Sequence, residues 1–296
     1  MPELPEVETI VNDLQKILPG LKLLDVLTDA KNLFRKNKFE DFKKKVVGEK
    51  ILNLSRKGKN ILIHLSGNTT ILIHQKMTGH LLYGKWVLET PPSGASWKSA
   101  EEGPIKDDPM NRFIHIVFRL SNGKELALSD MRKFAKVIAW PTDKLSELAD
   151  VKLGMDPFDK NFTLKKFKEL LASKKRGKIK SILMDQTLIA GIGNIYSDEI
   201  LWLAGVNPLK DISELSDGEM EKIYKAIRPV LERAIKARGT SASDYRDPMG
   251  RKGKYQEMQY AYRLTGKPCQ KNDGGTIARV KIGGRSAHYC PVHQRI

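Results

Sequence analysis

Apolar residues recur at helical spacing near the start of the chain. Between Pro5 and Leu18 they occupy positions 7, 10, 11, 14, 17 and 18, and Gly20 follows. This period predicts one amphipathic helix over Pro5–Leu18 that ends before Gly20. Proline suits the first turn of a helix, where its missing N–H is no loss. Acidic residues such as Glu6 and Glu8 are stabilised near the positive end of the helix dipole.

From about Lys22 to Trp140 the pattern changes to short β-rich runs separated by Gly, Asn and Ser turns. Evenly spaced short strands are typical of a sandwich or a barrel. The stretch Glu89–Pro109 has turn composition and predicts a long loop between two strands. The clearest strand candidates are Ile61–Leu65, Thr70–His74, Phe113–Phe118 and Lys136–Trp140.

After Asp159 the pattern becomes helical. Pro229 lies inside the last helical segment and predicts a kink or a break there. Asn194 is the expected N-cap of the third segment and Gly205 its expected stop. The four predicted helices cover Leu164–Leu171, Lys180–Met184, Ile195–Leu203 and Ser216–Arg238, and a short tail with two cysteines follows.

The charge of the chain narrows the choice of partner. Its 52 Lys and Arg against 35 Asp and Glu give a net charge of +17. Such a balance favours a polyanion, because each neutralised phosphate releases a condensed counterion. A merely solubilising basic surface and an anionic membrane are the alternatives, but no basic amphipathic helix with an aromatic face stands out. Nucleic acid is therefore the expected partner.

The composition also bears on compartment. No apolar run approaches the roughly 18 residues that a membrane span needs. The N-terminus is acidic and lacks the apolar core of a signal peptide. The two cysteines, Cys269 and Cys290, do not suggest a secreted disulfide framework. We therefore expect a cytoplasmic protein.

Pro2 is a candidate nucleophile. A small second residue favours removal of the initiator Met, which leaves Pro2 with a secondary-amine N-terminus. An α-amino group has an unperturbed pKa of about 7.7–8.0, so it is partly neutral and nucleophilic near neutral pH. Such an amine condenses with an aldehyde to an iminium, an electron sink for elimination. Glu3 lies beside it and can pass protons.

PELPEVET (Pro2–Thr9), the stretch Asp185–Pro208 and other motifs through the whole chain resemble those of the bacterial formamidopyrimidine-DNA glycosylase family, whose members are bifunctional repair enzymes for oxidised purines. The N-terminal PELPEVET (Pro2–Thr9) is similar to the signature of that family, and the match over Asp185–Pro208 is the most specific. The other similar stretches are SRKGKNILI (Ser55–Ile63), IHQKMTG (Ile73–Gly79), SDMRKFA (Ser129–Ala135), LGMDP (Leu153–Pro157), GTSASDY (Gly239–Tyr245) and GRSAHYCPVHQ (Gly284–Gln294).

The resemblance implies catalytic roles at matching positions. Pro2 matches the nucleophile that attacks C1′ and forms the Schiff base, and Glu3 matches the general acid/base. Lys59 matches the lysine that contacts phosphate and assists β-elimination; without the motif it would be a solvated lysine before a strand. Glu6 matches a supporting carboxylate, although helix-dipole complementarity explains it equally. Arg285 matches the arginine that grips phosphates and assists δ-elimination.

The resemblance also implies DNA contacts. Met77, Arg132 and Phe134 match residues that fill the gap left by a flipped nucleotide, where an apolar or planar wedge recovers part of the lost stacking. For Met77 and Phe134 the alternative is a place in the β-domain core. Asn194 matches a phosphate-contacting asparagine in a glycine turn that opens a helix. Lys175 aligns with a further DNA contact in the basic run Lys174–Lys180, and GTSASDY aligns with a loop that closes over the flipped base.

The chain departs from the family in its tail. The family has a zinc finger of the form C-x2-C…C-x2-C, whereas this chain reads CQKN (Cys269–Asn272) and CPVH (Cys290–His293). Cys269, Cys290 and His293 are good zinc ligands, and the fourth ligand would be Asn272 or Asp273. A hairpin held by packing alone, without zinc, is the alternative. A second departure is Phe113, where the family often has a DNA-contacting histidine two residues before His115; neither residue is assigned a role.

Together these observations predict an α+β protein. We expect an N-terminal helix with a β-sandwich catalytic domain over 1–145, a helix–two-turns–helix DNA-binding domain over 150–250, and a zinc-finger-like hairpin over 255–296. The expected protein is a monomer with no organic cofactor. It acts in the cytoplasm, associated with the nucleoid, on double-stranded DNA that contains an oxidised base or an abasic site.

The expected activity is base-excision repair: removal of 8-oxoguanine and formamidopyrimidines through a Schiff base on Pro2, followed by β,δ-elimination. An endonuclease VIII-like glycosylase for oxidised pyrimidines is the first alternative, and the PELPEVET start and the DMRKF stretch weigh against it. A catalytically silent DNA-binding paralogue is the second. The intact Pro2, Glu3 and Lys59 argue against that paralogue, while the altered finger argues for it.

Overall fold

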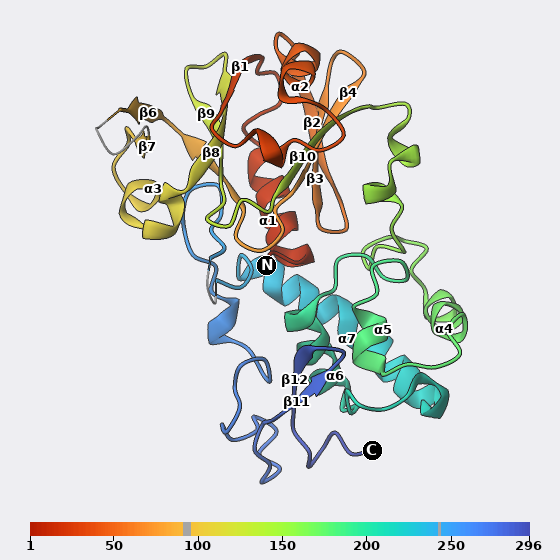
Figure 1. The fold of residues 1–296 in the computed structure, drawn as a ribbon. Helices are drawn as coiled ribbons and strands as arrows, with labels where there is room; N and C mark the ends of the chain where they lie inside the picture. Colours follow the sequence, from red (N-terminus) through yellow and green to blue (C-terminus); the bar gives the residue numbers. More distant parts are fainter. Residues whose placement is uncertain (91–95, 242–243) are drawn as a thin grey trace. The chain divides into compact units, whose positions relative to one another are not determined.

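The computed structural model describes residues 1–90, 96–241 and 244–296, and it divides into two compact units (Figure 1). The first unit comprises Met1–Lys152 and Ala237–Lys254, and the second comprises Leu153–Lys236 and Tyr255–Ile296. Each unit is described by itself.

Two antiparallel sheets form the first unit. One has the strand order β1-β8-β9-β5 and the other β10-β4-β3-β2, so the predicted β-sandwich is confirmed. The strands are β1 (Leu23–Thr28), β2 (Ile51–Lys57), β3 (Asn60–Leu65), β4 (Thr69–His74), β5 (His80–Gly84), β6 (Trp86–Glu89), β7 (Ser96–Ser99), β8 (Ile114–Leu120), β9 (Glu125–Ser129) and β10 (Lys136–Pro141). The helices are α1 (Leu4–Leu14), α2 (Phe39–Val46) and α3 (Pro104–Asp107).

A single hydrophobic core joins both sheets to α1 and α2. Ile61 of β3 faces Ile73 of β4, and both are fully buried. Val7 and Ile10 of α1 and Phe118 of β8 belong to the same buried cluster. Burial of apolar surface contributes about 25 cal/mol per Å², so this core fixes α1, and with it the N-terminus, to the sandwich.

Helix α1 is shorter than its periodicity predicts. It ends at Leu14 rather than Leu18, although Leu18 is still fully buried. Pro19 explains the difference, because the residue before a proline is driven away from helical backbone angles. The chain instead makes short turns, such as Ile17 N–H to Leu14 C=O at 3.0 Å.

The expected long loop over Glu89–Pro109 is wrong for most of its described length. Strand β7 pairs with β6, which places Trp86 opposite Ser99, and α3 follows. Trp86 is buried, and Trp97 packs against the same small apolar cluster. Two tryptophans supply most of the apolar contact here, so the turn-rich composition around them hid the hairpin. Residues 91–95 of this stretch lie outside the described residues.

The second unit is helical and carries a small hairpin. Its helices are α4 (Leu164–Ala172), α5 (Ile179–Leu183), α6 (Asn194–Ala204) and α7 (Asp217–Lys236), and its strands are β11 (Ala278–Ile282) and β12 (Arg285–Tyr289). Gly283 and Gly284, both with positive φ, form the two-residue turn between the strands. Asp198 of α6 accepts from both the backbone N–H and the ring Nδ1 of His288, which ties β12 to α6.

Two helix predictions in this unit need correction. Gly193, not Asn194, is the N-cap of α6, and Asn194 is its first residue; the predicted stop at Gly205, in the left-handed conformation, is confirmed. Helix α7 runs through Pro229 without a break. Pro229 is exposed, so water can satisfy the carbonyl that loses its N–H partner, while the buried Ile227 and Val230 hold the turns on either side.

Among the described residues, no helix combines the length and the apolar character needed to cross a membrane.

Gln75, directly after β4, supplies a test of the core. It is 1% exposed, and no hydrogen-bond partner for its Oε1 or Nε2 is found within the described part of the chain. We expect Gln75→Leu to raise the free energy of unfolding by about 1–3 kcal/mol, because it removes unpaired buried polar atoms at similar volume. Urea unfolding measures the change.

Gln294 is the matched control. It is also fully buried, but its amide donates to Val206 C=O at 2.9 Å and accepts from Cys290 N–H at 2.8 Å. Gln294→Leu should therefore destabilise the protein. A destabilised Gln75→Leu would contradict the assignment of unpaired atoms at position 75.

Candidate active site

The start of α1 gathers three predicted residues. Glu3 and Glu6 are 2% and 1% exposed, and Pro2 precedes them directly. The Glu6 carboxylate accepts from Glu3 N–H at 2.8 Å through Oε2 and from Thr240 N–H at 2.7 Å through Oε1. Met1, whose removal would free the Pro2 amine, is 39% exposed. The N-terminus is thus held by a buried carboxylate, with its first residue accessible.

Lys59 lies in the two-residue turn between β2 and β3, where Lys57 pairs with Asn60. This hairpin is tied to α1 by Arg56, whose Nε donates to Glu8 Oε2 at 2.5 Å and whose other nitrogen donates to Gly58 C=O at 3.1 Å. The structure therefore holds the Lys59 turn against α1, which follows Pro2 and is capped by Glu3. The pairing of Glu8 with Arg56 was not predicted from sequence, where Glu8 was assigned only to the helix dipole, because the pair depends on the packing of α1 on β2.

His74 is a further group in this neighbourhood. It ends β4, where it lies opposite Asn60 of β3 and Lys136 of β10. Burial, followed by the nearby positive charges of Lys76 and Lys59, lowers the pKa of His74 to about 4. His74 is therefore neutral near pH 7, and the positive charge of this cluster comes from its lysines.

Asp130 brings together the loops that hold the three predicted gap-filling residues. Its Oδ2 accepts from Phe134 N–H at 2.7 Å, and its Oδ1 accepts from Arg132 N–H at 3.3 Å and from the Thr78 hydroxyl. Thr78 follows Met77 directly, so one buried carboxylate orders both loops.

The side chains on these loops point outward. Met77 is 41% and Phe134 49% exposed, so the alternative that they belong to the β-domain core is wrong. The Arg132 guanidinium lies 4.5 Å from the centre of the Phe134 ring, a cation–π contact. His115, which received no role, lies with its Nδ1 2.9 Å from Asp29 Oδ1.

Asn194 and Lys175 lie in the second unit. The glycine turn before α6 is shaped by Gln186, whose Oε1 accepts from Gly191 N–H and whose amide donates to Ile192 C=O. Asn194 begins the helix, and within the described residues its buried Oδ1 has no hydrogen-bond partner. Lys175 is exposed in the connection between α4 and α5.

The prediction that Lys174–Lys180 supplies a basic face needs correction, because two of its lysines form ion pairs within the protein. Lys174 pairs with Asp185 at 3.1 Å. Lys180 is 1% exposed and donates to Asp198 Oδ1 at 2.5 Å and to Ser286 C=O at 2.9 Å. A buried lysine paired in this way joins α5, α6 and β12 and does not present its charge to a ligand.

Arg285 begins β12, directly after the glycine turn. It is exposed and lines a pocket of about 250 Å³ with Ser181, Met184 and Gly283. Its Nη1 lies 4.0 Å from the Met184 sulfur, a contact that supports the side chain without neutralising it. Arg285, Lys175 and Asn194 belong to the second unit, whereas Pro2, Glu3, Glu6, Lys59 and the gap-filling residues belong to the first.

Four side chains in the tail could hold a metal ion. One ligand atom each from Cys269, Asp273, Cys290 and His293 lies within 4.8 Å of all the others. Asp273, and not Asn272, joins the cluster: Asn272 is exposed with a left-handed φ of 53°. His293 Nε2 lies 3.2 Å from the Trp202 carbonyl oxygen, which can only accept a hydrogen bond. Nε2 therefore carries the ring proton, and the lone pair of Nδ1 faces the cluster.

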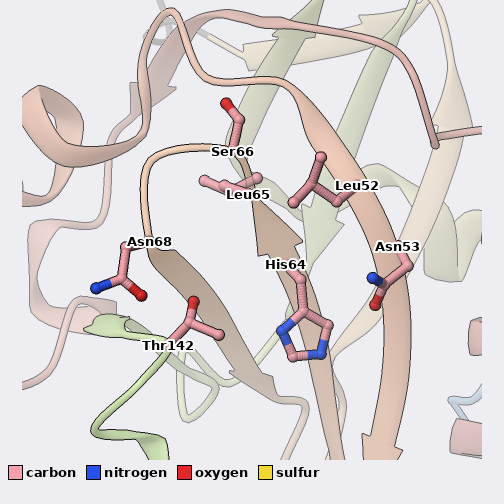
Figure 2. Close-up of a pocket in the computed structure, with 7 residues that line it drawn as sticks. All are labelled: Leu52, Asn53, His64, Leu65, Ser66, Asn68 and Thr142. Atoms are coloured by element: carbon pink, nitrogen blue, oxygen red, sulfur yellow. The ribbon is translucent and has the colours of Figure 1, made fainter.

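A separate pocket of about 530 Å³ lies on the sheet that contains β2, β3 and β4 (Figure 2). His64 lines it, and its Nε2 and Nδ1 lie 2.8 Å from Ser55 Oγ and 2.9 Å from Thr70 Oγ1. Burial lowers the pKa of His64. None of the predicted site residues is among those that line this pocket, which are Leu52, Asn53, His64, Leu65, Ser66, Asn68 and Thr142.

Comparison with known proteins agrees with this arrangement. The model of the formamidopyrimidine-DNA glycosylase N-terminal domain matches residues 1–137, and that of the formamidopyrimidine-DNA glycosylase H2TH domain matches residues 153–246. The formamidopyrimidine-DNA glycosylase of Pelotomaculum thermopropionicum is 40% identical over all of both chains. That of Desulforamulus reducens is 37% identical over 100% of this chain and 99% of its own.

Solved structures give the same answer. The Lactococcus lactis Fpg in complex with DNA containing an abasic site has a TM-score of 0.84 and 31% identity over 99% of this chain and 100% of its own. A complex of a mutant of the L. lactis protein with THF-containing DNA has a TM-score of 0.85 and 31% identity over the whole of both chains. The chain therefore belongs to the formamidopyrimidine-DNA glycosylase family of bifunctional DNA glycosylases and AP lyases.

Proposed function

We propose that this chain excises oxidised purines, 8-oxoguanine and formamidopyrimidines, from double-stranded DNA with the Pro2 amine as nucleophile. The proposal rests on two contacts of α1. Glu6 holds the backbone next to Pro2, and the Arg56–Glu8 pair holds the Lys59 turn to the same helix. The proposed nucleophile Pro2, the acid/base Glu3 and the cation Lys59 thus lie at the start of α1 and in the β2–β3 hairpin packed against it. DNA with Fapy-dG or an abasic site is the ligand of the L. lactis structures.

The proposed reaction begins when the neutral Pro2 nitrogen attacks C1′ of the damaged nucleotide. The bond from C1′ to the base breaks and its electron pair leaves with the base, which takes up the proton that the Pro2 nitrogen loses, while Glu3 gives a proton to the sugar ring oxygen. Ring opening leaves an iminium between Pro2 and C1′. Loss of a C2′ proton then expels the 3′-phosphate by β-elimination, for which Lys59 stabilises the departing oxyanion. A second elimination expels the 5′-phosphate, with Arg285 as the cation.

The outward-facing Met77, Arg132 and Phe134 have the chemistry that a flipped nucleotide requires. Flipping costs a few kcal/mol of stacking, and the exposed apolar groups of Met77 and Phe134 can fill the gap. Arg132, held over Phe134, can pair with the orphaned base. Asn194 and Lys175 would contact phosphates, and the net charge of +17 would supply the long-range attraction.

Zinc fits the tail cluster. In a tetrahedral site with bonds of about 2.0–2.3 Å, ligand atoms are separated by about 3.3–3.8 Å. Cys269 Sγ lies 3.6 Å from His293 Nδ1, and Cys290 Sγ lies 3.5 Å from Asp273 Oδ2. Asp273 and His293 are closer, at 2.7 Å, and would move apart around an ion. The Nε2 contact with Trp202 is the outer hydrogen bond that metal-binding histidines commonly make.

The proposed domains are a catalytic sandwich over 1–145, a DNA-binding helical domain over 150–250 and a finger-like hairpin over 255–296. Zinc would stabilise the hairpin that presents Arg285 and would take no part in the chemistry. We place the protein in the cytoplasm, associated with the nucleoid, because its proposed substrate is there. It would act as a monomer without an organic cofactor.

Borohydride trapping tests the nucleophile. An oligonucleotide with 8-oxoguanine opposite cytosine should form a covalent complex with the wild type, and Pro2→Gly should lower the yield strongly because the secondary amine is lost. Lys175→Gln, at saturating DNA, is the control that should trap normally, since it alters binding alone. No complex with the wild type, or an undiminished one with Pro2→Gly, would refute the proposed nucleophile.

Metal analysis tests the finger. We expect about one zinc per chain in the purified protein, since structural sites of this kind bind tightly. Cobalt substitution should give thiolate-to-cobalt absorption. Asp273→Ala should lower the zinc content, while the neighbouring Asn272→Ala should leave it unchanged. A zinc content below about 0.2 per chain would favour a hairpin held by packing alone.

A further inference from the structure

The segment Ala237–Lys254, called the strap below, belongs to the first unit although second-unit chain flanks it on both sides. Its first anchor is the backbone: Thr240 N–H donates to Glu6 Oε1 at 2.7 Å. Its second is Arg238, which bonds to Asp13 of α1 and to Asp247 within the strap. The strap is therefore fastened to the helix that carries the N-terminal site.

A third anchor comes from residues Pro104–Arg112, called the brace below. Arg246 of the strap makes a two-pronged ion pair with Asp108 of the brace: Nε donates to Oδ2 at 2.7 Å and Nη2 donates to Oδ1 at 3.0 Å. Arg246 is only 3% exposed. Partial burial alone would raise the pKa of Asp108, but the hydrogen bonds from Arg246 and from Met110 N–H lower it. The pair is charged at neutral pH and geometrically fixed.

The brace also packs on the strap without leaving space. The Asn111 amide donates to Gly250 C=O at 3.3 Å, and its Oδ1 lies 3.0 Å from His80 Nε2. Gly250 has a φ of +76°, and a Cβ there would lie 2.7 Å from the Asn111 amide nitrogen and 2.8 Å from Ile105 N. Only glycine fits this contact.

A short chain of bonds leads from the brace to the N-terminus. Arg246 donates to Tyr245 C=O at 2.7 Å, and the Ser241 hydroxyl donates to the same carbonyl at 2.6 Å. Ser241 follows Thr240, whose N–H holds one oxygen of Glu6. The other oxygen of Glu6 holds the backbone of Glu3, next to Pro2.

We propose that the brace is a positioning device for the reaction, and that Asp108 and Arg246 are positioning residues that keep the strap, and through it Glu6 and the N-terminus, in the reactive geometry. This inference rests on the proposed role of Pro2. Neither Asp108 nor Arg246 touches the reacting atoms. They act through the Thr240–Glu6–Glu3 bonds, and a shift of about 1 Å in a reacting group can cost as much as 100-fold in rate.

Asp108→Asn is the test, with Asp107→Asn as its matched control. Asp107 is the adjacent residue, is exposed, and undergoes the same change of charge. Under single-turnover conditions at saturating DNA, we expect borohydride trapping on 8-oxoguanine DNA to slow about 10-fold or more in Asp108→Asn. The Kd for that DNA should stay within about twofold of the wild type, because the substitution would slow the chemical step without weakening DNA binding. Asp107→Asn should match the wild type in both.

Amide hydrogen exchange provides a readout that loss of overall stability would not reproduce. In Asp108→Asn, exchange at Thr240 should accelerate while exchange in the β3–β4 hairpin stays unchanged. Arg246→Lys, which keeps the charge but loses the two-pronged geometry, should show the same pattern.

The outcomes separate the two proposals. A wild type that forms no covalent complex would overturn both the Pro2 role and the brace. A wild type that traps, with Asp108→Asn and Arg246→Lys trapping equally fast, would overturn the brace alone. So would a loss of rate that only follows the folded fraction measured by urea unfolding.

Discussion

The buried carboxylate of Glu6 is the constraint on which the N-terminal site depends. It is almost fully removed from solvent, which would be costly without donors. Glu3 N–H and Thr240 N–H, which are far apart in the sequence, supply them. Gly239 permits this approach, since a Cβ there would lie 2.7 Å from Glu6 Cγ. A chain end that is usually loose is thereby fixed.

Two other buried carboxylates, Asp130 and Glu199, hold loops in the same way. Asp130 collects the backbone N–H groups of Arg132 and Phe134 and the hydroxyl of Thr78. Glu199, almost fully buried, accepts from the N–H groups of Tyr260, Ala261 and Tyr262. Each carboxylate gains charge-assisted hydrogen bonds, and each loop gains a fixed conformation. Glu6, Asp130 and Glu199 therefore each order a stretch of backbone.

Periodicity predicted the start of α1, the main strands of the sandwich and the helices of the second unit, because these elements follow local alternation of apolar and polar residues. It failed where a distant contact decides. The β6–β7 hairpin depends on two tryptophans that pack on another sheet, and α7 passes Pro229 because its neighbours are buried. The local pattern of residues also gave no sign that Lys180 is buried against Asp198.

The site shows the same division. The resemblance predicted roles for Pro2, Glu3 and Lys59, since their motifs are contiguous in sequence. It did not reveal Arg56 and Glu8, whose ion pair forms only when α1 packs on β2. The choice of Asp273 over Asn272 likewise could not be read from the sequence, because it depends on which of the two side chains lies next to Cys269, Cys290 and His293.

The proposed nucleophile is the N-terminal nitrogen of Pro2, which would form the covalent bond to DNA. Peptide mapping by mass spectrometry after borohydride reduction identifies the modified residue directly. We expect the Met1-free N-terminal peptide to carry the reduced sugar adduct on Pro2. An adduct on Lys59 or on any other lysine would contradict it.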